Sequence, residues 1–148
     1  MGVGELKKVF VVGLLAVAGV FAAMAVAHGG GPGLDGTSLV AGNPTCPAGS
    51  SAFVVKVDPP SAGTHGFIQI TNLTDTTFDW NIHPDFLNVV DADIIIVKGG
   101  PNALLWDYGS GDDGALDDSG TGLHAPDNPN SGKLYGLSHI TFCFDPKA

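Results

Sequence analysis

The chain has 148 residues, 44% of them hydrophobic and 14% charged, a composition that suits one domain with its own hydrophobic core. It carries 15 acidic residues against six basic ones, a formal net charge of −9 at pH 7. Nucleic-acid binding requires a basic face that neutralises phosphates, so this balance argues against nucleic acid as a partner. An acidic surface instead favours solubility and attracts divalent cations.

The first 27 residues have the pattern of a secretory signal peptide. Lys7 and Lys8 precede the apolar range 9–26, and small residues on both sides of Val26 mark a cleavage site after Ala27. The alternative is an uncleaved anchor, because about 18 apolar residues is the shortest run that spans a bilayer. No second run of that length follows. We therefore expect a secreted or cell-surface protein with no membrane span after signal cleavage.

The remaining 121 residues hold 14 Asp and four Lys, with no Arg and no Glu. We expect a flexible Gly/Pro-rich leader over 28–45, followed by one domain over 46–148. Cys46 and Cys143 are the only cysteines, an even pair in an exported chain, where disulfides form and persist. Their bond would tie the start of the domain to its last strand.

Alternation of apolar and polar residues predicts a series of short β-strands. The candidate ranges are 53–57, 67–71, 77–82, 86–90, 92–97, 103–108 and a closing strand at 135–144. The unbroken apolar run within 92–97 suits a central strand covered on both faces. In the closing strand, Ile140, Phe142 and Phe144 share one buried face and Cys143 points away from it. The fold class expected is all-β, an antiparallel β-sandwich or jelly roll with one disulfide, preceded by a signal-peptide helix.

A loop of about 25 residues is expected over 109–133, because the range is dense in Gly, Asp, Asn and Pro and lacks apolar periodicity. It contains Asp112, Asp113, Asp117 and Asp118, whose carboxylates are the hard oxygen ligands that Ca²⁺ prefers. The spacing is not that of an EF-hand, and the alternative is a solvated acidic loop. Calcium is the one cofactor that the sequence suggests.

Three aromatic residues, Trp80, Trp106 and Tyr108, would contact a ligand such as a sugar ring if they were exposed. The alternative for all three is packing in the core. Ser138 and His139 are adjacent, but neighbours on a strand point to opposite faces, and the G-x-S-x-G motif that presents a serine nucleophile is missing. We therefore expect a protein that is not an enzyme.

Three motifs together resemble a recurring bacterial exported or cell-surface β domain that is largely uncharacterised. They are I-V-K-G-G-P-N at 96–102, G-L-H-A-P at 122–126 and G-L-S-H-I-T-F-C-F-D at 136–145. In that group an apolar strand ending in V-K-G-G precedes an aromatic strand, a variable loop and a closing S-H-I-x-F-C segment. The resemblance implies an extracellular β domain and supplies no catalytic residues.

These observations favour a secreted, non-catalytic β domain that is a structural or adhesive component of the cell surface or extracellular matrix. One alternative is a carbohydrate-binding module, which would present the three aromatic rings on its surface. The second is a small secreted hydrolase that uses Asp or His residues near the long loop. The partner would be a surface glycan or protein, and the oligomeric state is left open.

Overall fold

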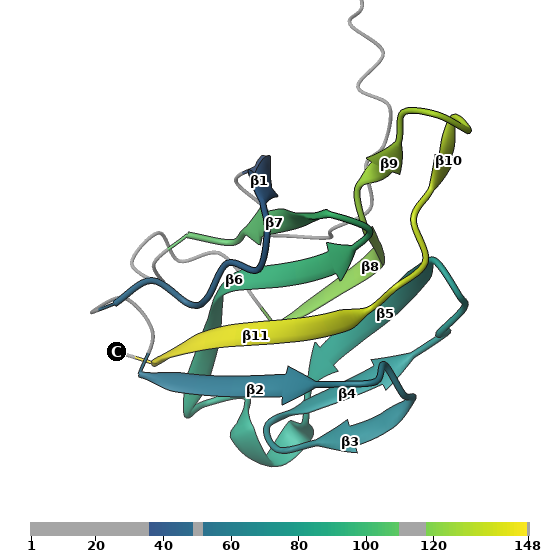
Figure 1. Ribbon diagram of the computed structural model, residues 1–148. Coiled ribbons are helices and arrows are strands. Elements are labelled where there is room, and N and C mark those ends of the chain that lie inside the picture. The colour runs from purple at the N-terminus through teal and green to yellow at the C-terminus, as the bar shows by residue number, and fades with distance from the viewer. Residues whose placement is uncertain (1–35, 49–51, 110–117, 148) are drawn as a thin grey trace, which may run out of the picture.

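The structure is a computed structural model that describes residues 36–48, 52–109 and 118–147. These residues form two antiparallel sheets packed into a β-sandwich (Figure 1). The strands are β1 (Gly36–Ala41), β2 (Phe53–Val57), β3 (Gly63–His65), β4 (Ile68–Thr71), β5 (Thr77–Ile82), β6 (Val90–Gly99), β7 (Asn102–Asp107), β8 (Ser119–His124), β9 (Asp127–Asn128), β10 (Lys133–Leu134) and β11 (His139–Pro146). A single 3₁₀ turn, η1 (Pro84–Phe86), lies between β5 and β6. The predicted all-β antiparallel class is confirmed.

One sheet has five strands in the order β1-β7-β6-β11-β2, and the facing sheet has four in the order β3-β4-β5-β8. Strands β9 and β10 form a separate two-stranded hairpin. The long strand β6 lies between β7 and β11, which confirms the central position expected for the apolar run at 92–97. In the described part of the chain, no helix is long and apolar enough to cross a membrane. The expected signal peptide lies outside the described residues.

The closing strand β11 packs its predicted face onto the facing sheet. Ile140, Phe142 and Phe144 are all buried in the main core. The ring of Phe142 lies 5.9 Å from that of Trp80 and 6.3 Å from that of Phe78, both on β5, in edge-to-face contact. Such pairs add to the stabilisation from burying the rings themselves. The alternation predicted for this strand is confirmed.

The three sequence motifs meet at one end of the sandwich. A Cβ atom at Gly99 would lie 2.8 Å from the carbonyl oxygen of Gly136 and closer still to the Cβ of Ala125. The next residue, Gly100, has φ +61, and the ring of Tyr135 covers it. Glycine is the one residue that fits both positions, because it lacks a side chain and adopts left-handed backbone freely. The V-K-G-G motif therefore forms a close-packed joint with the two later motifs.

The prediction of a flexible leader over 28–45 is wrong for residues 36–41, which the structure describes. Residues 36–41 form β1, which pairs with β7 along its whole length, from Gly36 opposite Asp107 to Ala41 opposite Asn102. The domain therefore includes residues well before Cys46. Local composition gave no sign of this strand, because its pairing partner lies more than 60 residues further along the chain.

The loop predicted over 109–133 is also wrong in part, since it contains β8, which pairs with β5. Glycine is a poor strand former. Gly122 has φ +64 and lies where the register between β5 and β8 shifts. The carboxylate of Asp79 on β5 accepts a hydrogen bond of 2.7 Å from the Gly122 amide at this irregularity. Tertiary pairing therefore overrides the weak local preference of this segment.

Candidate functional site

A groove of about 470 Å³ lies on the outer face of the five-stranded sheet, away from the core. Its lining residues are Asn43, Pro44, Thr45, Cys46, Val54, Lys56, Asp58, His139 and Thr141. Thr141 of β11 is directly opposite Lys56 of β2, and side chains that face each other across a pair of strands share one face. The neighbours of Thr141 on β11, Ile140 and Phe142, face the core, so the groove belongs to the opposite, outer surface.

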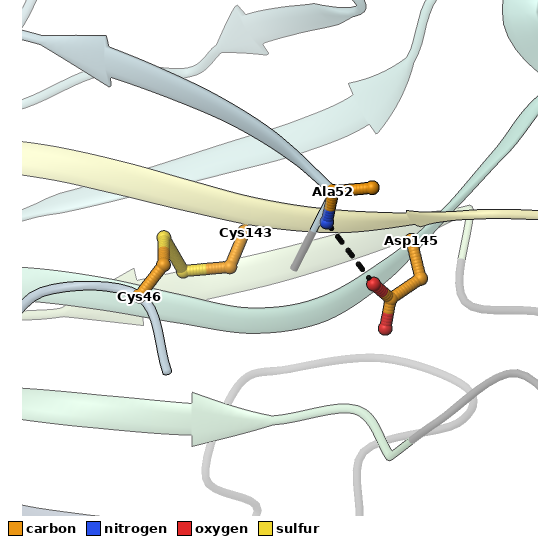
Figure 2. The surroundings of a disulfide bond; sticks show 4 residues. All are labelled: Cys46, Ala52, Cys143 and Asp145. Atoms are coloured by element: carbon orange, nitrogen blue, oxygen red, sulfur yellow. Dashed lines mark hydrogen bonds between the residues drawn. A yellow bond between two sulfur atoms is a disulfide. The ribbon is translucent and has the colours of Figure 1, made fainter. Parts of the chain in front are cut away.

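One wall of the groove is a strap, residues 42–48, that crosses the outer face of the sheet after β1. The Gly42 amide donates to the Pro101 carbonyl oxygen at 3.1 Å, which fixes the strap beside the β6–β7 turn. Further on, Cys46 forms the predicted disulfide with Cys143 of β11, with the two Cα atoms 5.7 Å apart (Figure 2). The disulfide covers a small second apolar cluster that includes Ile96. The strap is therefore held covalently against the middle of the sheet.

The other wall of the groove is the edge of the sheet at β2. The Ala52 amide donates to Asp145 Oδ1 at 3.3 Å, which holds the start of β2 against the end of β11 (Figure 2). Val54 is exposed and lies opposite Cys143, so its side chain borders the disulfide. The groove thus has an apolar centre between the two walls.

Charged and polar groups lie at the end of the groove near the β2 terminus. Lys56 Nζ and Asp58 Oδ2 form an ion pair at 3.3 Å, and both side chains are about half exposed. Burial lowers the pKa of His139, and the positive charge of Lys56 lowers it further, against a smaller opposite effect of Asp58. His139 is therefore neutral at pH 7, with one ring nitrogen as donor and the other as acceptor.

A second lysine lies beside His139 on the neighbouring strand. Lys98 of β6 is directly opposite His139, and its charge also lowers the pKa of His139. The Lys98 ammonium donates to the carbonyl oxygen of Gly100 and so closes the β6–β7 turn. Two of the four lysines beyond residue 27 therefore lie near this face of an otherwise acidic protein.

The aromatic residues predicted to contact a ligand are core residues instead. Trp80, Trp106 and Tyr108 are at most 1% exposed. The Trp80 indole donates to the Tyr108 hydroxyl at 3.3 Å, and their rings are 5.4 Å apart. The Trp106 indole donates to the His124 carbonyl oxygen at 3.3 Å. The prediction of a ligand contact is wrong, because all three rings lie in the core between the two sheets.

Of the four predicted calcium ligands, the structure describes Asp118 alone; Asp112, Asp113 and Asp117 lie outside the described residues. Lys147 Nζ lies 3.5 Å from Asp118 Oδ1 and 3.1 Å from Asp91 Oδ1, so a lysine occupies the position beside this carboxylate. Within the described ranges no group of three His, Cys or Asp side chains is placed to hold a metal ion. Calcium binding by the whole loop stays a prediction.

The two histidines considered for hydrolysis lie in separate places. His139 borders the groove, whereas His124 on β8 borders an open depression beside β1. The His124 ring contacts the Trp106 ring edge-to-face at 5.2 Å, and its Nδ1 lies 2.7 Å from the Ala125 carbonyl oxygen, to which it donates. Among the described residues, neither histidine hydrogen bonds to an aspartate. The hydrolase alternative therefore gains no supporting contact.

Sequence reasoning missed the groove, although part of its signal was present. Alternation placed Val54 and Lys56 opposite the core-facing residues of 53–57, and did the same for His139 and Thr141 in the closing strand. It did not indicate that these two strands are neighbours or that the strap lies beside them.

Comparison of the chain with protein-family models, curated proteins and solved structures finds no match.

Proposed function

We propose that the chain is a secreted, non-catalytic β domain, a structural or adhesive component of the cell surface or extracellular matrix, that binds its partner in the groove. The main support for this proposal is the groove itself, which is bounded by a strap fixed to the sheet through Cys46–Cys143. The disulfide itself fits an oxidising, extracellular location. The resemblance of the three motifs to an exported β domain points the same way.

The construction of the groove favours binding. Because the disulfide already holds the strap, a partner does not have to order it, and that entropic cost is absent from binding. The volume of about 470 Å³ lies in the range of about 300–1,000 Å³ found for ligand sites. Val54 and Pro44 supply apolar surface, and Lys56 supplies an exposed charge at the rim. This mixture suits a segment of a larger surface molecule.

The proposal is tested by charge reversal at Lys56. The labelled protein is added to isolated envelopes and matrix of the producing cells, and Lys56→Glu is expected to weaken binding by about tenfold, because an interfacial charge is inverted. The matched control is Lys133→Glu, at an exposed lysine on the β9–β10 hairpin. Binding by Lys56→Glu equal to that of the unmodified protein would refute the groove as the site. Substrate turnover that one point substitution abolishes would refute the non-catalytic assignment.

A glycan is the second candidate for the partner, and the polar groups of the groove support it. Asn43, Thr45 and Thr141 line it with an amide and two hydroxyl groups, which pair well with sugar hydroxyls. This version of a carbohydrate-binding module does not use the three buried aromatic rings. Binding on a glycan array that disappears with Thr45→Val would establish it, and an array without response would leave a protein partner.

A further inference from the structure

The five-stranded sheet ends in two edge strands, β1 and β2. Figure 1 places β1 beyond β7 and β2 beyond β11, at opposite sides of this sheet. An edge strand offers backbone N–H and C=O groups that no neighbour pairs, and proteins commonly protect such edges with lysine or proline. β2 contains one such residue, Lys56.

Strand β1 has neither form of protection. Its sequence, Gly-Thr-Ser-Leu-Val-Ala, contains no charge and no proline, and five of its six residues are exposed. In the described residues the large exposed hydrophobic side chains are Leu39 (63%), Phe53 (37%), Val54 (56%) and Val89 (49%). Three of these four lie on the two edge strands. β1 is therefore an unprotected edge that carries the most exposed of them.

Leu39 is exposed because the facing sheet does not cover β1. It lies opposite Leu104, whose side chain packs against the core, so Leu39 is on the inner face of the sheet. Together with Thr37 and Pro126 it borders an open depression of about 210 Å³. β1 thus extends beyond the sandwich, and its inner-face apolar surface is not covered by any of the described residues.

We propose that β1 pairs with β1 of a second copy of this chain, antiparallel and about a two-fold axis, which joins the two five-stranded sheets into one continuous sheet. A two-fold axis perpendicular to the sheet keeps inner faces together, and directly opposed side chains share a face. Centring the axis on Leu39 places it opposite Leu39 of the second copy and pairs Thr37 with Ala41. Each exposed leucine then covers the other.

The alternative contact between copies, β1 against β2, is less favourable. Successive antiparallel pairs through β7, β6 and β11 make β1 and β2 run in the same direction. Copies stacked by translation would pair these strands in parallel, which is slightly less stable per residue and occurs less often. Such a contact would also extend without closing, whereas a two-fold contact closes into a dimer.

Charge supports β1 as the place where two copies meet. Each chain has a formal charge of −9, so copies repel one another over most of their surfaces. β1 itself is uncharged, and Asp127 is the charged side chain that borders the adjoining depression. Salt screens this repulsion, so the dimer is expected to strengthen as ionic strength rises. This inference is independent of the groove and of the function proposed for it.

Sedimentation velocity of the naturally processed protein tests the dimer. Leu39→Lys is expected to raise the dimer dissociation constant by about tenfold or more, because it charges the unprotected edge. Val89→Lys is the matched control at an exposed hydrophobic residue off both edges, and Val54→Lys tests the β2 edge. A monomeric unmodified protein at high salt, or a dimer unaffected by Leu39→Lys, overturns the proposal. Open-ended oligomers that Val54→Lys also disrupts would replace it with β1–β2 pairing.

Cross-linking tests the register. Opposed residues in an antiparallel pair have Cβ atoms about 4.5–5.5 Å apart, so Leu39→Cys is expected to form an intermolecular disulfide readily on mild oxidation. Val40→Cys lies opposite Ser38 of the second copy in this register and is expected to cross-link poorly. Equal cross-linking of both variants, or preferential cross-linking of Val40→Cys, refutes the Leu39-centred pairing. Thermal unfolding of each variant checks that the fold is retained.

Discussion

Replacing Lys147 by methionine removes the one ammonium group that lies beside two carboxylates near the end of β11. Lys147 Nζ is 3.1 Å from Asp91 Oδ1 and 3.5 Å from Asp118 Oδ1, and it also donates to the Leu87 carbonyl oxygen at 2.9 Å. Apart from Lys147, neither carboxylate oxygen has a polar partner within the described residues. Methionine keeps most of the aliphatic stem, so the substitution removes the ammonium group, with its charge and its hydrogen bond to Leu87, and little of the packing.

The cost follows from the burial of the partners. Asp91 is 5% exposed, while the Lys147 side chain is 30% exposed. Breaking a fully buried pair costs about 3–5 kcal/mol and breaking an exposed one at most about 1 kcal/mol. For this intermediate case we expect Lys147→Met to lower the free energy of unfolding by about 2 kcal/mol at pH 7.

The free energy of unfolding should also depend on pH in the alkaline range, through Lys147 itself. Burial lowers the pKa of Lys147, but the hydrogen bond with Asp91 and the charges of Asp118 and Asp91 outweigh it, so the pKa is raised above its ordinary value of 10.5. A raised lysine pKa stabilises the native state fully below the unfolded-state pKa, and this contribution is lost as pH rises through the folded-state pKa. The unmodified protein should therefore lose stability above about pH 10.5, and Lys147→Met should lack this loss.

Urea unfolding at pH 7 and at pH 10 and above measures these differences. Lys133→Met is the control, because Lys133 is exposed and takes part in no ion pair within the described residues. The double variant Lys147→Met with Asp91→Asn should recover part of the lost stability, since no buried charge is then left without a partner. A change below about 0.5 kcal/mol at pH 7, the usual range for surface substitutions, would refute the reasoning.

Two further predictions concern the joint between motifs and the strap. Gly99→Ala should lower the free energy of unfolding by about 3 kcal/mol, because its new methyl group would overlap the Cβ of Ala125. Gly36→Ala is the control and should change the free energy little, because the space beside Gly36 is open. Urea unfolding measures both variants, and equal effects would contradict the packing argument. Replacing Cys46 and Cys143 together by alanine should cost up to about 4–5 kcal/mol, since the bond joins residues 97 apart in the sequence. Thermal and urea unfolding under oxidising and reducing conditions measure it, and a loss below about 1 kcal/mol would contradict the chain-entropy argument.

Much of the fold was predictable where side-chain alternation is strong. The range 77–82 was predicted with the bounds that β5 has, because Phe78 and Trp80 alternate with polar residues that face away from the core. The disulfide was predictable because two cysteines allow one pairing. The segments that became β1 and β8 carry no such pattern. They are strands because β7 and β5 offer them unpaired backbone groups.

The sequence predicted the faces of single residues of the candidate site but not the groove that they line. Alternation assigned Lys56 and His139 to faces turned away from the core, but each assignment concerns a single strand. The groove exists because β2 lies beside β11 and the strap crosses the sheet to reach Cys143, and these are contacts between distant parts of the chain.

By itself the sequence determined the acidic charge, the all-β class, the disulfide and the buried face of the closing strand, since each depends on composition or on local periodicity. The tertiary structure alone decided which strands are neighbours, that Trp80, Trp106 and Tyr108 are covered, and that β1 is an edge strand among the described residues. The physical reason is that alternation separates the two faces of a strand without saying what lies against either face. Pairing and coverage depend on the free energy of the whole assembled sandwich.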